Sequence, residues 1–378
     1  MDNNATTRTA PEVVEAMLPW LREHWANPSS PTHAGEQAAD AVRASRTEVA
    51  RLLGAPRARE VVFTSGGSEG IASAFWAAHR RHPDRPRMVL SAVEHSAVVR
   101  NAEVFGQRGL EIVTIPVDGE GRLDRERLMR AIDERCALVS LMWANNETGV
   151  MTDLRGVADA CRRHGVTYHL DAVQAPGKTP LNAPDSGADL ITISGHKFHG
   201  PKGTGALWVR DGFPFEALVV GGPQEGEKRA GTENVPGIVG LGRAASLAHE
   251  HARDADALDR LAGLRDHLET GILERVPGTR AHGSGAPRVP NTTNVCFEGL
   301  EARSLLILLS EQGVEVAAGS ACHATRSGPS PVLLAMGCSE SEASSSLRFS
   351  LSRETTLEEL DLALEEVLRA TGTLRALA

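Results

Sequence analysis

Apolar and polar positions change along the chain in a way that predicts strands and helices in turn. Short apolar runs rich in β-branched residues predict buried strands at 61–63, 88–90, 111–115, 138–141, 166–170 and 190–193. Apolar residues three or four positions apart predict helices between them at 68–80, 96–107, 124–132 and 154–163. This alternation predicts an α/β fold whose large domain has a mainly parallel, doubly wound sheet covered on both faces.

The two ends of the chain predict further elements. Helical spacing occurs at 11–21, 36–53, 239–276, 302–312 and 357–370, and strand patterns at 293–297 and 347–351. We expect a large domain over residues 11–252 and a smaller α+β domain formed by residues 1–10 and 253–378. The boundary would then lie inside one long helix.

Composition narrows the class of protein. The chain has 378 residues, 41% of them hydrophobic, and a net charge of −9. An acidic chain has no basic excess to neutralise phosphates, so we expect no nucleic-acid binding. It has no apolar run of membrane-spanning length and no leader peptide pattern, so we expect a cytoplasmic protein without membrane contact. Its five scattered cysteines are typical of a reducing compartment.

One lysine is a candidate for amine chemistry. The chain has only four lysines, and Lys197 directly follows the strand predicted at 190–193. An amine at the end of a buried strand can lose solvent, which lowers its pKa and favours condensation with a carbonyl. The alternative is a solvated lysine in a glycine-rich turn. Ser194, His196 and His199 in the same turn favour chemistry.

The residues around this lysine carry a family resemblance. Ser-Gly-His-Lys-Phe-His-Gly-Pro-Lys-Gly, residues 194–203, resembles the cofactor-lysine segment of cysteine desulfurases. These are pyridoxal-phosphate enzymes of fold type I in the class V aminotransferase group. The resemblance implies that Lys197 binds pyridoxal 5'-phosphate, that Ser194 and His196 contact it, and that the large domain holds it. Histidine pairs such as His79 with His82 lack cysteine or carboxylate companions at metal spacing, so we expect no metal site.

Other motifs that follow predicted strands resemble the same family. A glycine-rich turn that opens a helix can bind an anion, or it can be only a turn; the resemblance makes Gly66, Gly67 and Ser68 the phosphate site. His95 would stack on the pyridine ring and handle protons. Asp171 would pair with the pyridine nitrogen, and Gln174 would donate to the phenolic oxygen. The sequence departs from the family at Gly70, where many relatives have a polar residue.

Two residues are expected to hold the substrate. Asn145 lies in Asn-Asn-Glu-Thr-Gly, which by itself indicates a turn, and Arg348 lies inside an apolar strand, where a guanidinium needs an anion. The resemblance makes Arg348 the residue that binds the substrate carboxylate, and makes Asn145 a contact either to that carboxylate or to the ring oxygen of the cofactor.

Cys322 begins a Ser/Gly/Pro-rich segment with His323 and Arg326, and these cationic neighbours favour a thiolate. Gly-Ser-Ala-Cys, residues 319–322, resembles the active-cysteine loop of the family. Cys136, Cys161, Cys296 and Cys338 are interpreted as packing residues.

Thr232 and Arg229 match family residues in the polar segment 221–237, where the threonine reaches the phosphate of a neighbouring subunit. This implies a homodimer with composite active sites. Gly226 stands where relatives often have arginine.

Together the motifs predict a cysteine desulfurase, which converts L-cysteine to L-alanine and leaves the sulfur on Cys322 as a persulfide for transfer to a protein acceptor. The alternatives are a pyridoxal-phosphate C–S lyase or selenocysteine lyase, and a non-catalytic relative that binds a partner. Iron–sulfur assembly, tRNA or DNA thiolation and natural-product sulfur all remain open as destinations of the sulfur.

Overall fold

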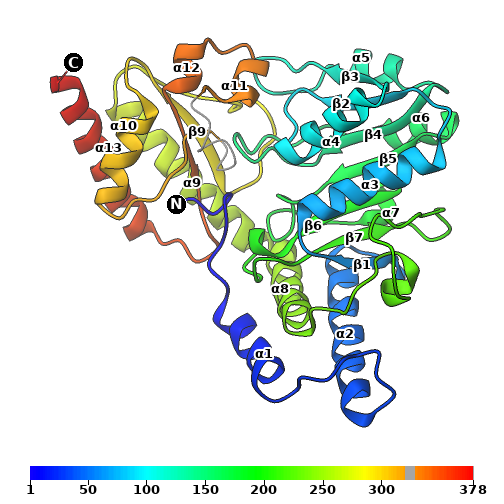
Figure 1. Ribbon diagram of the computed structural model, residues 1–378. Helices are drawn as coiled ribbons and strands as arrows, with labels where there is room; N and C mark the ends of the chain where they lie inside the picture. The colour runs from blue at the N-terminus through cyan, green and yellow to red at the C-terminus, as the bar shows by residue number, and fades with distance from the viewer. Residues whose placement is uncertain (320–327, 378) are drawn as a thin grey trace.

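The computed structural model describes residues 1–319 and 328–377. Two β-sheets lie apart from one another, each with its own helices (Figure 1). The larger sheet is built from residues 61–209 and the smaller from residues 279–350. In the part of the chain that the structure describes, no helix is both long enough and apolar enough to span a bilayer.

The larger sheet has seven strands in the order β1-β7-β6-β5-β4-β2-β3. These strands are β1 (Val61–Thr64), β2 (Arg87–Ser91), β3 (Glu111–Ile115), β4 (Cys136–Met142), β5 (Thr167–Asp171), β6 (Leu190–Ser194) and β7 (Gly205–Val209). Strand β7 runs antiparallel to both of its neighbours, and the remaining pairs are parallel. The predicted α/β class with a mainly parallel sheet is confirmed.

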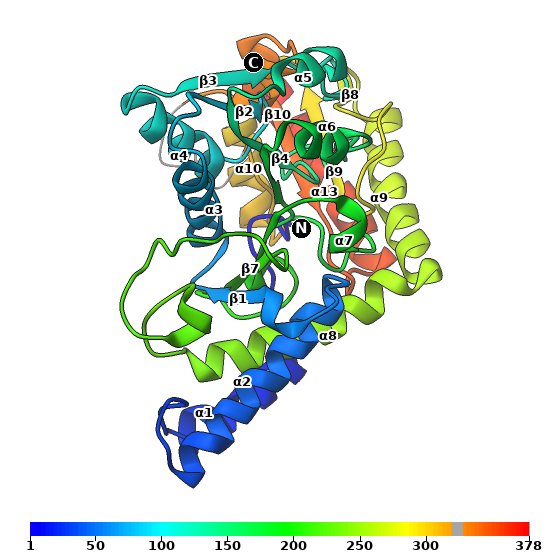
Figure 2. The same ribbon diagram turned by 90° about the vertical axis from the view of Figure 1, so that its right-hand side faces the viewer.

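Helices cover both faces of this sheet. They are α1 (Pro11–Arg22), α2 (His33–Leu52), α3 (Gly67–Arg81), α4 (Ser96–Gln107), α5 (Arg125–Ala131), α6 (Val157–His164), α7 (Ala183–Ser186) and α8 (Val235–Arg253). Successive residues of a strand point to opposite faces. Accordingly, Met88 and Leu90 pack with Phe75 and Phe105 of α3 and α4, whereas Val89 belongs to the core on the other face. Helices α1 and α2 both contact α8, and the three run together at one end of the molecule (Figure 2).

The smaller sheet is antiparallel and has the order β10-β9-β8. Its strands are β8 (Thr279–Ala281), β9 (Thr292–Phe297) and β10 (Ser346–Ser350), and its helices are α9 (Ala255–Arg275), α10 (Ala302–Glu311), α11 (Pro331–Ala335), α12 (Glu340–Ser344) and α13 (Leu357–Leu377). Leu268, Phe297, Leu347 and Val367 belong to a core separate from that of the larger sheet. The first residues of the chain join this sheet, because the backbone N–H of Asn3 donates to Ser350 O (3.1 Å).

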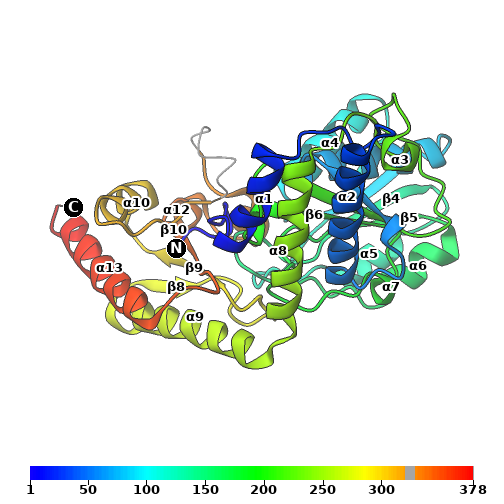
Figure 3. The ribbon, with the colours of Figure 1, turned by 90° about the horizontal axis from the view of Figure 1, so that it is seen from below.

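The single helix expected at 239–276 is wrong. Helix α8 ends at Arg253 and α9 begins at Ala255, and the two meet at an angle (Figure 3). Asp254 between them has an extended backbone (φ −88°, ψ 99°), and its carboxylate caps α9 by accepting from Ala257 N (3.0 Å). Aspartate is a preferred N-cap residue, so Asp254 was the one local sign in the sequence that a new helix begins here. The pattern also missed the strands β7 and β8 and the short helices α7, α11 and α12.

Close packing of α3 on β6 explains the glycine at position 70. A Cβ atom at Gly70 would lie 2.7 Å from Thr192 Cγ2 on β6. The position faces the sheet and does not line the cavity described below, so this glycine serves the packing of the helix. Because α3 can approach β6 closely, its first turn lies beside the carboxyl end of that strand.

Gly70→Ala should therefore destabilise the protein. The added methyl group overpacks the α3–β6 contact, and we expect a loss of about 1–3 kcal/mol in the free energy of unfolding, measured with urea. Gly263→Ala is the matched control, because Gly263 is an exposed residue of α9 whose new Cβ would meet nothing within 4 Å. That change should stabilise by about 0.5–1 kcal/mol. Equal stabilisation by both changes would contradict the packing argument.

Candidate active site

A cavity of about 190 Å³ lies at the carboxyl ends of β4, β5 and β6. Ligands of open parallel sheets bind at this edge. Most residues expected to bind cofactor or substrate line it: Gly67, Ser68, His95, Asp171, Gln174, Ser194, His196, Lys197 and Arg348. Most of them lie on or just after elements of the larger sheet and its helices, whereas Arg348 lies on β10 of the smaller sheet.

The glycine-rich turn lies at the start of a 15-residue helix, α3. Gly66 has a φ of +154°, which favours glycine, and Gly67 and Ser68 are the first helical residues. The unpaired N–H groups of a first helical turn and the helix dipole attract anions. Gly66 itself lines an adjoining hollow that shares Gly67 and Ser68 with the Lys197 cavity. This corner of the cavity suits a phosphate.

Lys197 and Asp171 lie near the ends of neighbouring strands. Lys197 follows β6 in a short 3₁₀ turn, and its Nζ donates to Asn4 O (2.6 Å) and Ala5 O (2.8 Å). Asp171 ends β5 and is 4% exposed, and Val173 N donates to its Oδ1 (3.0 Å). Burial raises the pKa of the Asp171 carboxyl, and His95, the Val173 N–H and Lys197 oppose that rise. A buried carboxylate with this environment needs a cationic partner.

Two histidines line the cavity in defined states. His95 caps α4, and its Nδ1 accepts from Ala97 N (3.1 Å), so the proton of the neutral ring is on Nε2. His196 Nδ1 lies 3.2 Å from Thr6 Oγ1. Burial, together with the positive charges of Lys197 and Lys202 and with His95, lowers the pKa of His196 to about 4. His196 is therefore neutral at neutral pH.

Arg348 and Asn146 each leave one polar atom for a ligand. Arg348 Nη1 donates to Asn146 O (2.9 Å), and Nη2 pairs with Asp2 Oδ1 (2.5 Å). Arg348 Nε and Asn146 Oδ1 are buried and have no hydrogen-bond partner among the described residues. Both residues line the cavity. A guanidinium donor and an amide acceptor match the carboxylate and the ammonium group of an amino acid.

Asn145, the residue expected to hold substrate, does not line this cavity. Its Nδ2 donates to Val93 O (3.0 Å), and its Oδ1 accepts from the N–H groups of Glu147 (2.8 Å) and Thr148 (2.9 Å). Its side chain therefore closes the turn. Asn146 lines the cavity in its place, and sequence reasoning missed it, together with Asn4, because adjacent asparagines give no signal of which one faces a ligand.

Cys322, with His323 and Arg326, lies outside the described residues. The chain on either side is fixed near Arg348: the backbones of Ala317 and Arg348 exchange two hydrogen bonds (2.7 and 3.2 Å), and Ser330 Oγ donates to Glu147 Oε2 (2.5 Å). Glu147 is close enough to Arg348 to interact with its charge. Both ends of the segment that contains Cys322 therefore lie on the Arg348 side of the cavity.

The other four cysteines are poor nucleophiles. Burial raises the pKa of the Cys136 thiol to about 12, and burial also raises the pKa of Cys161, Cys296 and Cys338. All four are protonated at neutral pH and have no thiolate to offer.

Thr232 does not line the Lys197 cavity of its own chain. It is exposed and borders a second cavity of about 200 Å³, together with Ser65 and Arg229. Arg229 Nε donates to Glu69 Oε1 (2.9 Å), next to Ser68. Gly226 lies in a turn with φ +62°, within a segment held by the bidentate pair of Glu225 with Arg46 (2.6 and 2.7 Å).

These residues fit pyridoxal 5'-phosphate. The first turn of α3 suits its phosphate, the buried Asp171 suits its cationic pyridine nitrogen, and the amine of Lys197 suits its aldehyde. No group of three or more histidine, cysteine, aspartate or glutamate side chains within the described ranges could hold a metal ion.

Known proteins are similar to this chain over its whole length. The family model for aminotransferase class-V matches residues 1–363. A cysteine desulfurase of Cereibacter sphaeroides is 47% identical over 379 residues, which cover 100% of this chain and 97% of that protein. A cysteine desulfurase of Sinorhizobium fredii is 42% identical, with 99% of this chain and 97% of that protein covered.

Solved structures have the same architecture. A NifS-like protein superposes with a TM-score of 0.91 at 33% identity and covers 99% of both chains. A structure of SspA in complex with cysteine superposes with a TM-score of 0.82 at 30% identity, covering 94% of this chain and 99% of that one.

Alanine substitutions at Asn145 and at Asn146 should have different effects on the stability of the protein. Asn145→Ala removes a donor and an acceptor that close a buried turn, so we expect the free energy of unfolding in urea to fall by about 1–3 kcal/mol. Asn146→Ala keeps the backbone carbonyl that Arg348 binds, so its change should stay within about 0.5 kcal/mol. The reverse order would show that the two roles are interchanged.

Proposed function

Since the chain belongs to the aminotransferase class-V family and is a cysteine desulfurase, we propose that the cavity around Lys197 is its active site. There L-cysteine and an enzyme thiol would give L-alanine and an enzyme persulfide, a transfer in which all atoms balance. The observation that carries this assignment is one cavity lined by the Lys197 amine, the buried Asp171 carboxyl and Arg348, whose Nε has no partner among the described residues.

We propose that Lys197 binds pyridoxal phosphate, with Gly67 and Ser68 at its phosphate and Asp171 at its pyridine nitrogen. When bound, this cofactor withdraws electrons from the substrate Cα, so that the Cα proton can be removed. Gln174, Ser194 and His196 complete the wall around it. The neutral state of His196 adds no positive charge beside Lys197.

The substrate carboxylate would bind Arg348. Two of its guanidinium nitrogens are already fixed by Asn146 O and Asp2, so the group is held rigidly before substrate arrives. Asn146 Oδ1 would accept from the substrate amino group. The two groups that then handle protons are the amine of Lys197 and the Nε2 atom of His95, and both residues line the cavity.

Cys322 is the proposed nucleophile toward the substrate sulfur. Two observations support it: the described ends of its segment lie beside Arg348 and Glu147, and burial keeps the thiols of the other four cysteines protonated. The persulfide would then pass to a protein acceptor, whose identity does not follow from the site.

We propose that two chains form a homodimer in which Thr232 of one subunit contacts the cofactor phosphate held by the other. Thr232 is exposed and does not reach the cavity of its own chain, while its neighbour Arg229 lies beside the α3 turn. Exposed apolar residues such as Leu21, Trp25 and Val220 supply surface that a second subunit can cover.

Cys322→Ala should separate sulfur transfer from cofactor binding. We expect the visible absorption of bound pyridoxal phosphate to persist, because the residues that hold it are unchanged, while alanine formation falls on the order of a hundredfold or more. Cys338→Ala is the control and should retain activity. Brief exposure of the wild type to cysteine, followed by alkylation and peptide mass spectrometry, should find a persulfide on Cys322. Full alanine formation by Cys322→Ala would overturn the assignment.

Composite sites can be tested by mixing variants. Lys197→Ala should lose the absorption band of the lysine-linked cofactor and all turnover, and Thr232→Ala should bind the cofactor weakly. In a heterodimer of the two, one site has both defects and the other has none. Random exchange at equal concentrations should therefore restore about a quarter of wild-type activity. No gain on mixing, with exchange verified by mass, would show that Thr232 acts within its own chain or not at all.

A further inference from the structure

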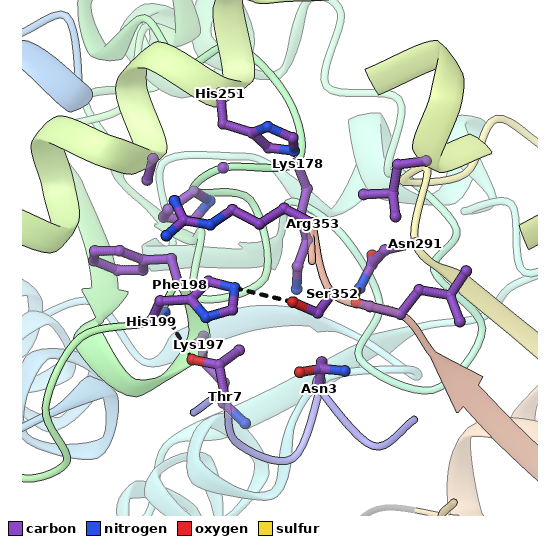
Figure 4. A pocket seen from close by; sticks show the side chains of 15 residues that line it. Asn3, Thr7, Lys178, Lys197, Phe198, His199, His251, Asn291, Ser352 and Arg353 are labelled. Carbon is purple, nitrogen blue, oxygen red and sulfur yellow. Dashed lines mark hydrogen bonds between the residues drawn. The ribbon is translucent and has the colours of Figure 1, made fainter. Parts of the chain in front are cut away.

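Lys178 is a buried lysine to which the proposed reaction gives no role. It is 8% exposed and follows Gln174 in the turn after β5. Figure 4 shows a smaller cavity that lies beside the Lys197 cavity. Lys178 and Lys197 line it, together with Asn291 and Ser352. That cavity has a volume of about 30 Å³, room for a water molecule but not for a substrate.

The amine of Lys178 fixes two amide side chains. Its Nζ donates to Gln174 Oε1 (2.5 Å) and to Asn4 Oδ1 (3.1 Å). With its oxygen held there, the orientation of the Gln174 amide is fixed, and its Nε2 donates to Asn4 O (3.0 Å). The same carbonyl accepts from Lys197 Nζ (2.6 Å). Lys178 is thus one hydrogen-bonded residue away from the lysine assigned to the cofactor.

Asn4 connects this group to the smaller sheet. Its backbone N–H donates to Ser350 Oγ on β10 (2.9 Å), and its Nδ2 donates to Thr292 Oγ1 on β9 (2.9 Å). Its Oδ1 also accepts from Asn291 Nδ2 (3.1 Å). The position of Asn4, and with it the carbonyl that holds Lys197, therefore depends on contacts from both sheets.

The chemistry of this position suits a neutral amine. Both acceptors of the Lys178 amine are amide oxygens and not carboxylates, and a neutral amine has two N–H bonds to give them. Burial, and then the positive charges of Lys197 and Arg348, lowers the pKa of Lys178 well below its ordinary value. A lysine kept for an ion pair would have a carboxylate partner, so orientation of the two amides is the role that the contacts support.

We propose that Lys178 is a positioning residue for this enzyme: its amine holds the amides of Gln174 and Asn4, and thereby sets the direction in which Gln174 donates and the place of the Lys197 amine. The inference rests on the proposed function, because Gln174 and Lys197 are the residues assigned to the cofactor. It adds a residue that lies behind the cavity and does not line it.

The test is Lys178→Met, which keeps the length of the side chain and removes its donors. We expect the dissociation constant of pyridoxal phosphate to rise about five- to tenfold, the effect of losing an oriented hydrogen bond. The pH midpoint of the visible absorption band of the loaded enzyme should also rise, because a donor to the anionic phenolic oxygen is no longer held in place. Lys228→Met, at a lysine that borders neither cavity, should change neither value.

A double-mutant cycle separates positioning from a general structural role. In a Gln174→Ala background, Lys178→Met should raise the dissociation constant less than it does in the wild-type background, because one of the two amides through which it acts is gone and only Asn4 remains. The same five- to tenfold loss in that background, or no loss in the wild-type background, would overturn the proposal. If Lys178→Met does not fold, Lys178→Gln decides by the same measurements, since its amide is polar but too short to reach both acceptors.

Failure of the proposed function gives a different result. Wild-type protein that binds no pyridoxal phosphate, or binds it without forming alanine from cysteine, would refute the assigned activity before any variant is made. Failure of the positioning role appears only as a Lys178→Met enzyme that matches the wild type in cofactor affinity and in its pH midpoint.

Discussion

The parallel pairing of β5 and β6 is the constraint on which the site depends. The register sets Asp171 opposite Thr192, so a carboxyl group and the Lys197 turn finish on the same edge of the sheet. Burying charged groups costs free energy unless each has a partner. Both faces of the sheet are covered, and β4, β5, β6 and β7 have no exposed residue, so Asp171 at the end of β5 is buried. A ligand with a cationic ring nitrogen and an aldehyde meets both requirements.

The amino-terminal segment is the second constraint, because it connects the two sheets beside Lys197 and Arg348. Asp2 pairs with Arg348, and the carbonyls of Asn4 and Ala5 accept from Lys197. These contacts come from residues almost 200 positions and more than 300 positions away in sequence. A shift of the smaller sheet would thus move both the Arg348 guanidinium and the carbonyls that accept from Lys197.

Local patterns predicted what local physics determines. The strand that precedes Lys197, the apolar run that ends at Asp171 and the glycine-rich start of α3 each need only a short stretch of sequence, and the structure brings all three to one cavity. The resemblance supplied the roles, which remain proposals for individual residues. The domain boundary at residue 252 also remains a prediction, although the chain turns at Asp254.

What the sequence did not reveal depends on contacts between distant segments or on a shift of one residue. Asn145 and Asn146 have the same side chain. They differ because Asn145 closes the backbone turn with its hydrogen bonds, which leaves Asn146 to line the cavity. Nothing in the sequence near Lys178 shows that Asn4, which is far away in the chain, provides one of the two acceptors of its amine. Gly70 has no local signal that explains it, because the side chain that leaves no room for a Cβ atom there belongs to Thr192 on a distant strand.

Electrostatics limits the number of positive charges around Lys197. Burial favours the uncharged forms of His196 and Lys178, since the positive charges of Lys197 and its neighbours add to the desolvation cost. Arg348 directs its guanidinium at Asp2 and at the carbonyl of Asn146. The lower pKa of each of these residues reduces the positive charge that would compete with Arg348 for a carboxylate. The Arg348 guanidinium is therefore held beside the cavity by fixed contacts, while the Lys197 amine donates to the backbone carbonyls of Asn4 and Ala5.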